Sequence, residues 1–388
     1  MNLRSTWRPN KDEVISKNGV VASMHPYASE AGIEMLRKGG NAIDAAVATG
    51  FAISVLEPNN SSIAGVGFMH ISLNSQIKNN PSGTNVVIEY GPRAPKAAKP
   101  NMYKITGPGG GISTYSVEGN HNTDGYQSIA LPGTTAGLCK AHEIFGELPL
   151  EQVMEPAIHY AKEGYDVYWL LALMIGTNME QLQKFHGSKE IFLPNGFPPK
   201  YIPDPSSADH EAFKFKQKDL GNLLEKISKE GADALYKGEI ASAIEEDMKK
   251  NDGLITMADL AEFKAEIKIP LKTTFRDYEV YGPTAPCGSW TTLETLNILE
   301  NFDLKIYYRD DAIGFNNPSI NEGILTRNKP LIRLLGLDKL NYNNDPQSDG
   351  NFDFVEGFTI DSKKGNIIFP VLEPFGSTLN SYFLESNE

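Results

Sequence analysis

The clearest pattern of apolar and polar positions lies over residues 20–72. Apolar and small residues recur there at intervals of three and four, which predicts one face of an amphipathic helix that begins near Pro26. These residues are Ala28, Ala31, Gly32, Met35 and Leu36. Gly39-Gly40 ends the helix, because glycine adopts the left-handed conformation at a helix C-terminus without a steric penalty. Residues 20–22, before the helix, are predicted to form a short buried strand.

A second helix is predicted over residues 42–56, where the sequence is apolar almost all the way round. Such a helix is buried on every side, and this one is too short to span a bilayer. Asn41 caps its start, and Asp44 can complete a capping box. Pro58 stops the helix, and a run of small residues over 61–67 leads into a strand at 68–73.

The rest of the chain alternates between further helices, strands and loops. Strands at 68–73 and 86–90 are separated by turn-forming residues and predict a hairpin. Residues 104–127 are predicted to form a long surface loop, and the apolar run at 170–174 a piece of core. The remaining predictions are a helix pair from 131 to 164, an extended connector at 192–205, helices within 217–250, a helix capped by Thr256, strands at 270–271 and 278–282, and a helix at 291–300.

Composition narrows the class of protein. The 388 residues, 40% of them hydrophobic, can bury a large core in one domain or two. A net charge of -13 argues against nucleic-acid binding. The polar start of the sequence, without a long apolar run, predicts a cytoplasmic protein rather than a membrane protein. Cys139 and Cys287 lie far apart, so we expect no disulfide, no metal site and no cofactor, with Cys139 a buried structural thiol.

Several motifs then occur in a recognisable order. They are VASMHP, EAGIEMLRKGGNAIDAAVA, VLEP, IAGVGFM, PGTTAG and GELPL. In this order the chain resembles the γ-glutamyltranspeptidase family of N-terminal-nucleophile hydrolases. The resemblance implies an α+β fold, a four-layer αββα sandwich, incomplete in its C-terminal half. It implies a single domain over residues 1–388, in which 20–300 matches the large-subunit region, 302–350 is degenerate and 351–388 is a remnant of the nucleophile strand and the following hairpin.

In this family a threonine exposed by self-cleavage attacks the γ-glutamyl amide, with its own α-amino group as base. The local frame of strand, turn and strand is present over residues 357–369. Counting back without gaps from Gly365-Asn366 places Val355 at the nucleophile position, and valine has no hydroxyl to attack a carbonyl. Thr359 is the nearest alternative nucleophile, although it is equally a residue that favours strands.

The resemblance also implies residues that contact the substrate. Within a heptad that can otherwise be a simple turn, Thr378 would polarise the nucleophile, and Asn380 and Ser381 would hold the substrate. The family arginine that binds the α-carboxylate aligns with Gly91. Arg93 is either its replacement, as a bidentate carboxylate ligand, or a surface charge that a strand would point to the other side.

The sequence ends at Glu388, whereas the resemblance implies later residues that carry the ligand of the substrate amine, paired serines and glycine oxyanion donors. On this expectation, unpaired strand edges would be covered by a second chain or by a homo-oligomer. Two hypotheses follow. One is a γ-glutamyltransferase or glutathione hydrolase for small γ-glutamyl substrates, inactive as this chain alone and completed by a partner. The other is a pseudoenzyme, a non-catalytic relative that serves in binding or assembly.

Overall fold

The structure is a computed structural model that describes residues 14–73, 84–109, 115–201 and 213–301, together with the backbone of two short strands, β10 (Thr359–Ile360) and β11 (Ile367–Ile368). By their internal contacts the residues divide into two compact units, Met1–Lys268 with Val371–Glu388, and Ile269–Pro370. Helices and small antiparallel sheets occur together, which confirms the predicted α+β class. That the whole chain forms one domain stays a prediction.

The first two helices begin and end where the sequence predicts. Helix α1 (Pro26–Arg37) is followed by Gly39 in the left-handed region, with φ of 86°. Helix α2 (Ala42–Leu56) starts at a complete capping box: Asn41 Oδ1 accepts from the backbone N–H of Asp44 at 3.1 Å, and the Asp44 carboxylate accepts from the N–H of Asn41 at 2.9 Å. These caps satisfy backbone groups that the helix itself leaves unpaired.

Residues 20–22 form no strand, so this prediction is wrong. They are half-buried, and the side chain of Val21 packs against the helical core. The apolar residues here pack against helices and do not pair with a strand. Periodicity alone does not show whether an apolar segment has a neighbouring strand to pair with.

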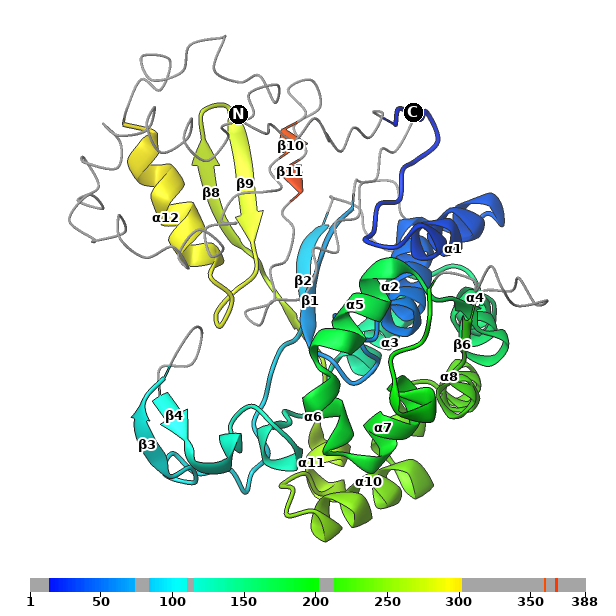
Figure 1. Cartoon of the computed structure of the whole chain (residues 1–388). Helices are drawn as coiled ribbons and strands as arrows, with labels where there is room; N and C mark the ends of the chain where they lie inside the picture. The colour runs from blue at the N-terminus through cyan, green and yellow to red at the C-terminus, as the bar shows by residue number, and fades with distance from the viewer. Residues whose placement is uncertain are drawn as a thin grey trace, which may run out of the picture. The chain divides into compact units, whose positions relative to one another are not determined.

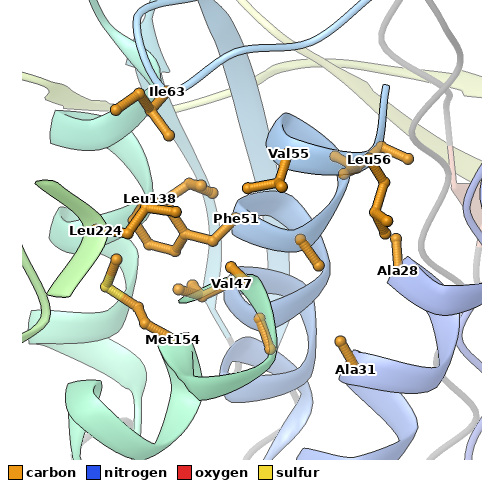
Figure 2. Close-up of a cluster of buried hydrophobic side chains, with 14 of the residues drawn as sticks. Ala28, Ala31, Val47, Phe51, Val55, Leu56, Ile63, Leu138, Met154 and Leu224 are labelled. Carbon is orange, nitrogen blue, oxygen red and sulfur yellow. The ribbon is translucent and has the colours of Figure 1, made fainter. Parts of the chain in front are cut away.

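Helix α2 lies at the centre of the first unit, and every residue from Ile43 to Leu56 is buried. It packs against α1, α3 (Thr134–Phe145) and α4 (Leu150–Glu163), and α4 packs in turn against α8 (Lys218–Glu230) (Figure 1). Figure 2 shows Phe51 extending from α2 toward Leu138 of α3 and Leu224 of α8, while Ala28 and Ala31 of α1 lie on the other side of α2. The apolar surface all round α2 is thus covered on all sides, as predicted.

A three-stranded antiparallel sheet belongs to the same unit. Strands β1 (Gly67–Leu73) and β2 (Thr84–Tyr90) form the predicted hairpin, with Gly67 opposite Tyr90. The short strand β7 (Glu266–Lys268) pairs with the other edge of β2. Alternate side chains, including Met69 and Ile88, enter the core shared with the helices.

The segment 104–127 is more regular than predicted, because it contains a hairpin of β3 (Ile105–Pro108) and β4 (Tyr115–Val117) and two 3-10 turns, η1 (Glu118–Asn120) and η2 (Tyr126–Ser128). Helix α5 (Trp169–Thr177) buries Leu171 and Ile175 and so forms part of the core. The other elements of this unit are β5 (Tyr165–Asp166), α6 (Met179–Gln183), α7 (His186–Phe192), η3 (Pro194–Gly196), β6 (Lys214–Phe215), α9 (Asp233–Tyr236), α10 (Gly238–Lys250) and α11 (Met257–Glu262).

The second unit contains the hairpin of β8 (Leu271–Phe275) and β9 (Tyr278–Gly282) and the helix α12 (Ser289–Leu299), which packs on both strands. Strands β10 and β11 pair antiparallel, with Thr359 opposite Ile368. Of the frame predicted around Thr359, the structure describes these two paired strands, and the turn between them lies outside the described residues.

Candidate functional site

The structure places only part of the predicted site. It describes Gly91 and Arg93 with their surroundings and gives the backbone of Thr359 in β10. Val355, Thr378, Asn380 and Ser381 lie outside the described residues. Their roles stay predictions, and the geometry that the structure defines is the geometry around Arg93.

The guanidinium of Arg93 is bound by groups of the protein itself. Its Nη2 donates to Oε1 of Glu266 at 2.7 Å, and its central carbon lies 5.2 Å from the centre of the Phe263 ring. The side chain is 32% exposed. Arg93 is thus ion-paired within the protein, and a substrate carboxylate would have to compete with Glu266 for its guanidinium. Its role as a replacement of the family arginine stays a prediction.

Glu266 belongs to a small network of charges on β7. It also forms an ion pair with Lys268, and this hydrogen bond, assisted by the charge of Arg93, holds the pKa of the Glu266 carboxyl below its usual value. Glu266 stays ionised at neutral pH and carries two cationic partners. The net positive charge that this cluster presents to an anion is therefore smaller than its two cations alone would give.

Gly91 occupies the position that the family resemblance assigns to the carboxylate-binding arginine. It is buried, and a Cβ atom placed there would lie 3.2 Å from Cζ of Phe68. Such a contact is tighter than ordinary van der Waals packing. Any larger side chain at position 91 would require Phe68 to move, so a glycine fits the packing that this chain has adopted.

Behind Arg93 lies a stack of buried aromatic rings. Phe263 is parallel to Tyr236, with ring centres 5.7 Å apart. The hydroxyl of Tyr236 donates to the carbonyl of Pro132 at 2.8 Å and accepts from the N–H of Ala136 at 3.2 Å. Burial raises the pKa of Tyr236, so this hydroxyl remains a neutral donor. The stack fixes Arg93 relative to the start of helix α3.

The glycine-containing loop 61–67 is bound to the same end of α3. The carbonyl of Gly65 accepts from the N–H groups of Gly133 and Thr134 at 2.7 and 2.9 Å, and the carbonyl of Ile63 accepts from the N–H of Thr135 at 3.1 Å. Helix α3 has no side-chain cap, and these carbonyls take that role. Its first amides are thus used within the protein.

Close packing of α3 against β2 requires glycine at position 137. A Cβ atom placed there would lie 2.0 Å from Cδ1 of Tyr90, closer than atoms can approach. The Tyr90 ring therefore lies directly on the backbone of α3. This contact connects the strand that precedes Gly91 and Arg93 to the helix that the glycine loop caps.

The thiol of Cys139 offers no alternative nucleophile. Cys139 is buried, and burial, with a smaller contribution from Glu143, raises the pKa of its thiol to about 12. It has the buried structural character predicted for it and is not an activated nucleophile. Within the described ranges, no three His, Cys, Asp or Glu residues lie close enough to hold a metal ion. No helix in this part of the chain is long and apolar enough to cross a membrane.

Sequence reasoning missed Glu266, Phe263 and Tyr236 as neighbours of Arg93. Arg93 and Glu266 are 173 residues apart, so no local spacing connects them. The sequence signal near Glu266 is the short run Glu266–Lys268, in which charged residues flank Ile267. Such a run is compatible with a strand, but it does not show that Glu266 pairs with Arg93.

Comparisons with known proteins show which proteins this chain is similar to. The sequence model of the family described as Gamma-glutamyltranspeptidase matches residues 28–316. The chain is 36% identical over 295 residues to an acylase ACY 1 proenzyme of Pseudomonas sp. strain SE83, covering 76% of this chain and 50% of that protein. It is 36% identical over 302 residues to a glutathione hydrolase proenzyme of Escherichia coli strain K12, covering 76% and 47%. The chain thus spans about half the length of the curated relatives it matches.

Among solved structures, the crystal structure of Helicobacter pylori gamma-glutamyltranspeptidase aligns with a TM-score of 0.68 and 32% identity over 86% of each chain. A cephalosporin acylase from Bacillus halodurans aligns with a TM-score of 0.66 and 25% identity, covering 80% of this chain and 54% of that one. These likenesses confirm the predicted fold type, that of the N-terminal-nucleophile hydrolases related to gamma-glutamyltranspeptidase.

Proposed function

Because the chain belongs to the gamma-glutamyltranspeptidase family, we propose that it is the scaffold half of an enzyme that cleaves or transfers γ-glutamyl amides, and that this chain does not catalyse the reaction alone. The observation that carries the first part is the match to the H. pylori structure over 86% of both chains. The names of the relatives, glutathione hydrolase and acylase, support amide cleavage as the reaction class.

The second part depends on position 355. Attack on an amide carbon requires an oxygen or sulfur nucleophile, and the γ-carbon branches of Val355 offer neither. Arg93 adds to this expectation, since Glu266 already occupies its guanidinium. An α-carboxylate would gain less from Arg93 than from an arginine without such a partner.

The direct test is an assay of the purified chain with a chromogenic γ-glutamyl anilide, combined with its intact mass. We expect no turnover and a single species at 42.6 kDa, because no hydroxyl at position 355 can start self-cleavage. Turnover by the chain alone, abolished by Thr359→Ala, would contradict this part of the proposal. So would a free N-terminus anywhere from Val355 to Thr359.

A second arm adds in trans a threonine-led second half from the E. coli relative. If this chain is a competent scaffold, the mixture hydrolyses the anilide while neither part does so alone. The matched control is the same mixture with Phe51→Ala, which removes a buried core side chain and should lower activity in proportion to the unfolded fraction.

The second candidate is a non-catalytic relative that serves in binding or assembly, and the observation that favours it is Val355 itself. In that case the mixture with a threonine-led half also remains inactive although the two parts associate. Size-exclusion chromatography of the mixture separates association without turnover from absence of association.

A further inference from the structure

Helix α1 begins with a cap that can be titrated. His25 is the residue before the first turn, and its Nδ1 accepts a hydrogen bond from the backbone N–H of Tyr27 at 3.2 Å. Among the described helices, the caps of α2 and α11 are instead the amide of Asn41 and the hydroxyl of Thr256. A histidine can act as this acceptor only when Nδ1 carries no proton.

The imidazole is buried among tyrosine rings. It is 7% exposed, and the centres of the Tyr168, Tyr27 and Tyr165 rings lie 5.0, 5.2 and 6.3 Å from its own. The hydroxyl of Tyr165 donates to the carbonyl of Val55 at 3.0 Å, and that of Tyr168 to the carbonyl of Leu56 at 3.2 Å. The start of α1 is thus connected through these rings to the end of α2.

The ionisable groups around His25 come from four elements. Tyr27 lies on α1, together with Glu30 and Glu34, and Tyr160 of α4 stacks on Tyr27. Burial raises the pKa values of Tyr160, Tyr165 and Tyr168, so all three are neutral. At the end of α2, burial also raises the pKa of Glu57, which is 2% exposed. Burial lowers the pKa of His25 itself to about 4.

We propose that His25 is a proton-sensitive latch, in which the neutral imidazole holds the first turn of α1 and protonation releases it. Three physical effects act in the same direction. A protonated Nδ1 is a donor and faces another donor, the N–H of Tyr27. A positive charge at a helix N-terminus is opposed by the helix dipole. The charge would also lie in a pocket of aromatic rings that excludes water.

The sign of the pH dependence follows from these effects. With the latch open, the imidazole has the pKa of an exposed histidine, and with the latch closed it has the lower value. The closed state is therefore fully favoured above about pH 6.5 and is lost progressively as the pH falls toward 4. We expect the protection of the first-turn amides of α1 to fall about tenfold between pH 7.5 and pH 5.5, and about tenfold again over the next unit.

The test measures hydrogen exchange of the backbone amides of residues 27–31 in the whole chain between pH 7.5 and pH 4.5, as protection factors corrected for the intrinsic exchange rate. His25→Asn keeps a side-chain cap that does not titrate in this range. His186→Asn is the matched control, because it is the same substitution at a histidine outside α1 whose side chain is 93% exposed. The expected result is a pH-dependent loss of protection in the wild type and in His186→Asn, and none in His25→Asn.

Equal pH dependence in the wild type and in His25→Asn would overturn the proposal. If His25→Asn does not fold, the ring of His25 in wild-type protein labelled with ¹³C-histidine decides instead. A ring that titrates near 6.5, or one that titrates lower while the α1 amides keep their protection, would equally contradict the latch. Neither readout depends on catalytic activity, so the latch and the proposed function can fail separately.

Discussion

Helices α2 and α12 show two different ways in which this chain stabilises a helix. They have 15 and 11 residues, and both are largely apolar or uncharged. In α2 all residues from Ile43 onward are buried, whereas in α12 only Leu293 is. Helix α2 starts at a capping box, while Gly288 before α12 provides no side-chain cap. A low content of charged residues therefore does not measure how strongly a helix is stabilised; packing and capping do.

The polar groups of the two helices differ in the same way. Buried Thr49 and Ser54 donate to the carbonyls of Ala45 and Gly50, both at 2.8 Å, so that α2 contains no orphaned hydroxyl. Thr295 in α12 makes the same type of bond to Thr291 at 2.8 Å, but at an exposed position. A buried hydroxyl in α2 without such a bond would be left unsatisfied at a cost in stability, whereas water could replace the bond of the exposed Thr295.

The largest expected effect comes from emptying the core around α2. Phe51→Ala removes a fully buried ring between α2, α3 and α8, and we expect it to lower the free energy of unfolding by about 3–5 kcal/mol. Ile298→Ala in α12, where the side chain is 44% exposed, should change it by less than about 1 kcal/mol. Denaturant unfolding followed by circular dichroism measures both. Equal losses would remove the contrast between the helices.

The next effect concerns the buried carboxyl that ends α2. Burial raises the pKa of Glu57, so the folded protein binds this proton more tightly than the unfolded chain does. The associated stability is present at low pH and is lost as the pH rises through the folded pKa. Glu57→Gln keeps an acceptor for Asn60, which donates at 3.3 Å, and removes the charge.

We therefore expect Glu57→Gln to be more stable than the wild type at pH 7, with a difference that shrinks as the pH falls toward 4. Melting temperatures of both proteins across this range measure the effect. A variant that is less stable than the wild type at pH 7, or a difference that does not change with pH, would contradict this prediction.

The smallest effect comes from the cap itself. Asn41→Ala removes the acceptor for the N–H groups of Ile43 and Asp44, and we expect a loss of about 1 kcal/mol. Lys272→Gln, which breaks the exposed ion pair with Glu279 in the second unit, is the control and should leave the unfolding midpoint unchanged. If both variants behave alike, the capping box contributes no more than a surface contact.

The features that were predicted correctly depend on residues close to one another in the sequence. The capping box at Asn41, the helix cap at Thr256, the left-handed Gly39 and the hairpin of β1 and β2 are local, so spacing alone identified them. The strand predicted over residues 20–22 was wrong, because an apolar run does not show whether it meets a strand or a helix. The hairpin within 104–127 was hidden by its glycines and polar residues.

The candidate site was predicted less completely, because its contacts join distant segments. Arg93 was identified by its place in a motif, but its partners Glu266 and Phe263 follow from how β7 and α11 fold back on β2. Whether position 355 truly holds the place of the nucleophile rests on a count of residues, and Thr378, Asn380 and Ser381 rest on the same resemblance.

The contact between Tyr90 and Gly137 has a consequence for how β2 can be placed. A strand that slips by one residue turns each of its side chains to the opposite face. Such a slip would withdraw the Tyr90 ring from the backbone of α3 at Gly137 and remove the close contact between them. The contact between Tyr90 and Gly137 thus favours the observed register of β2, and this register sets the positions of Gly91 and Arg93, which follow the strand.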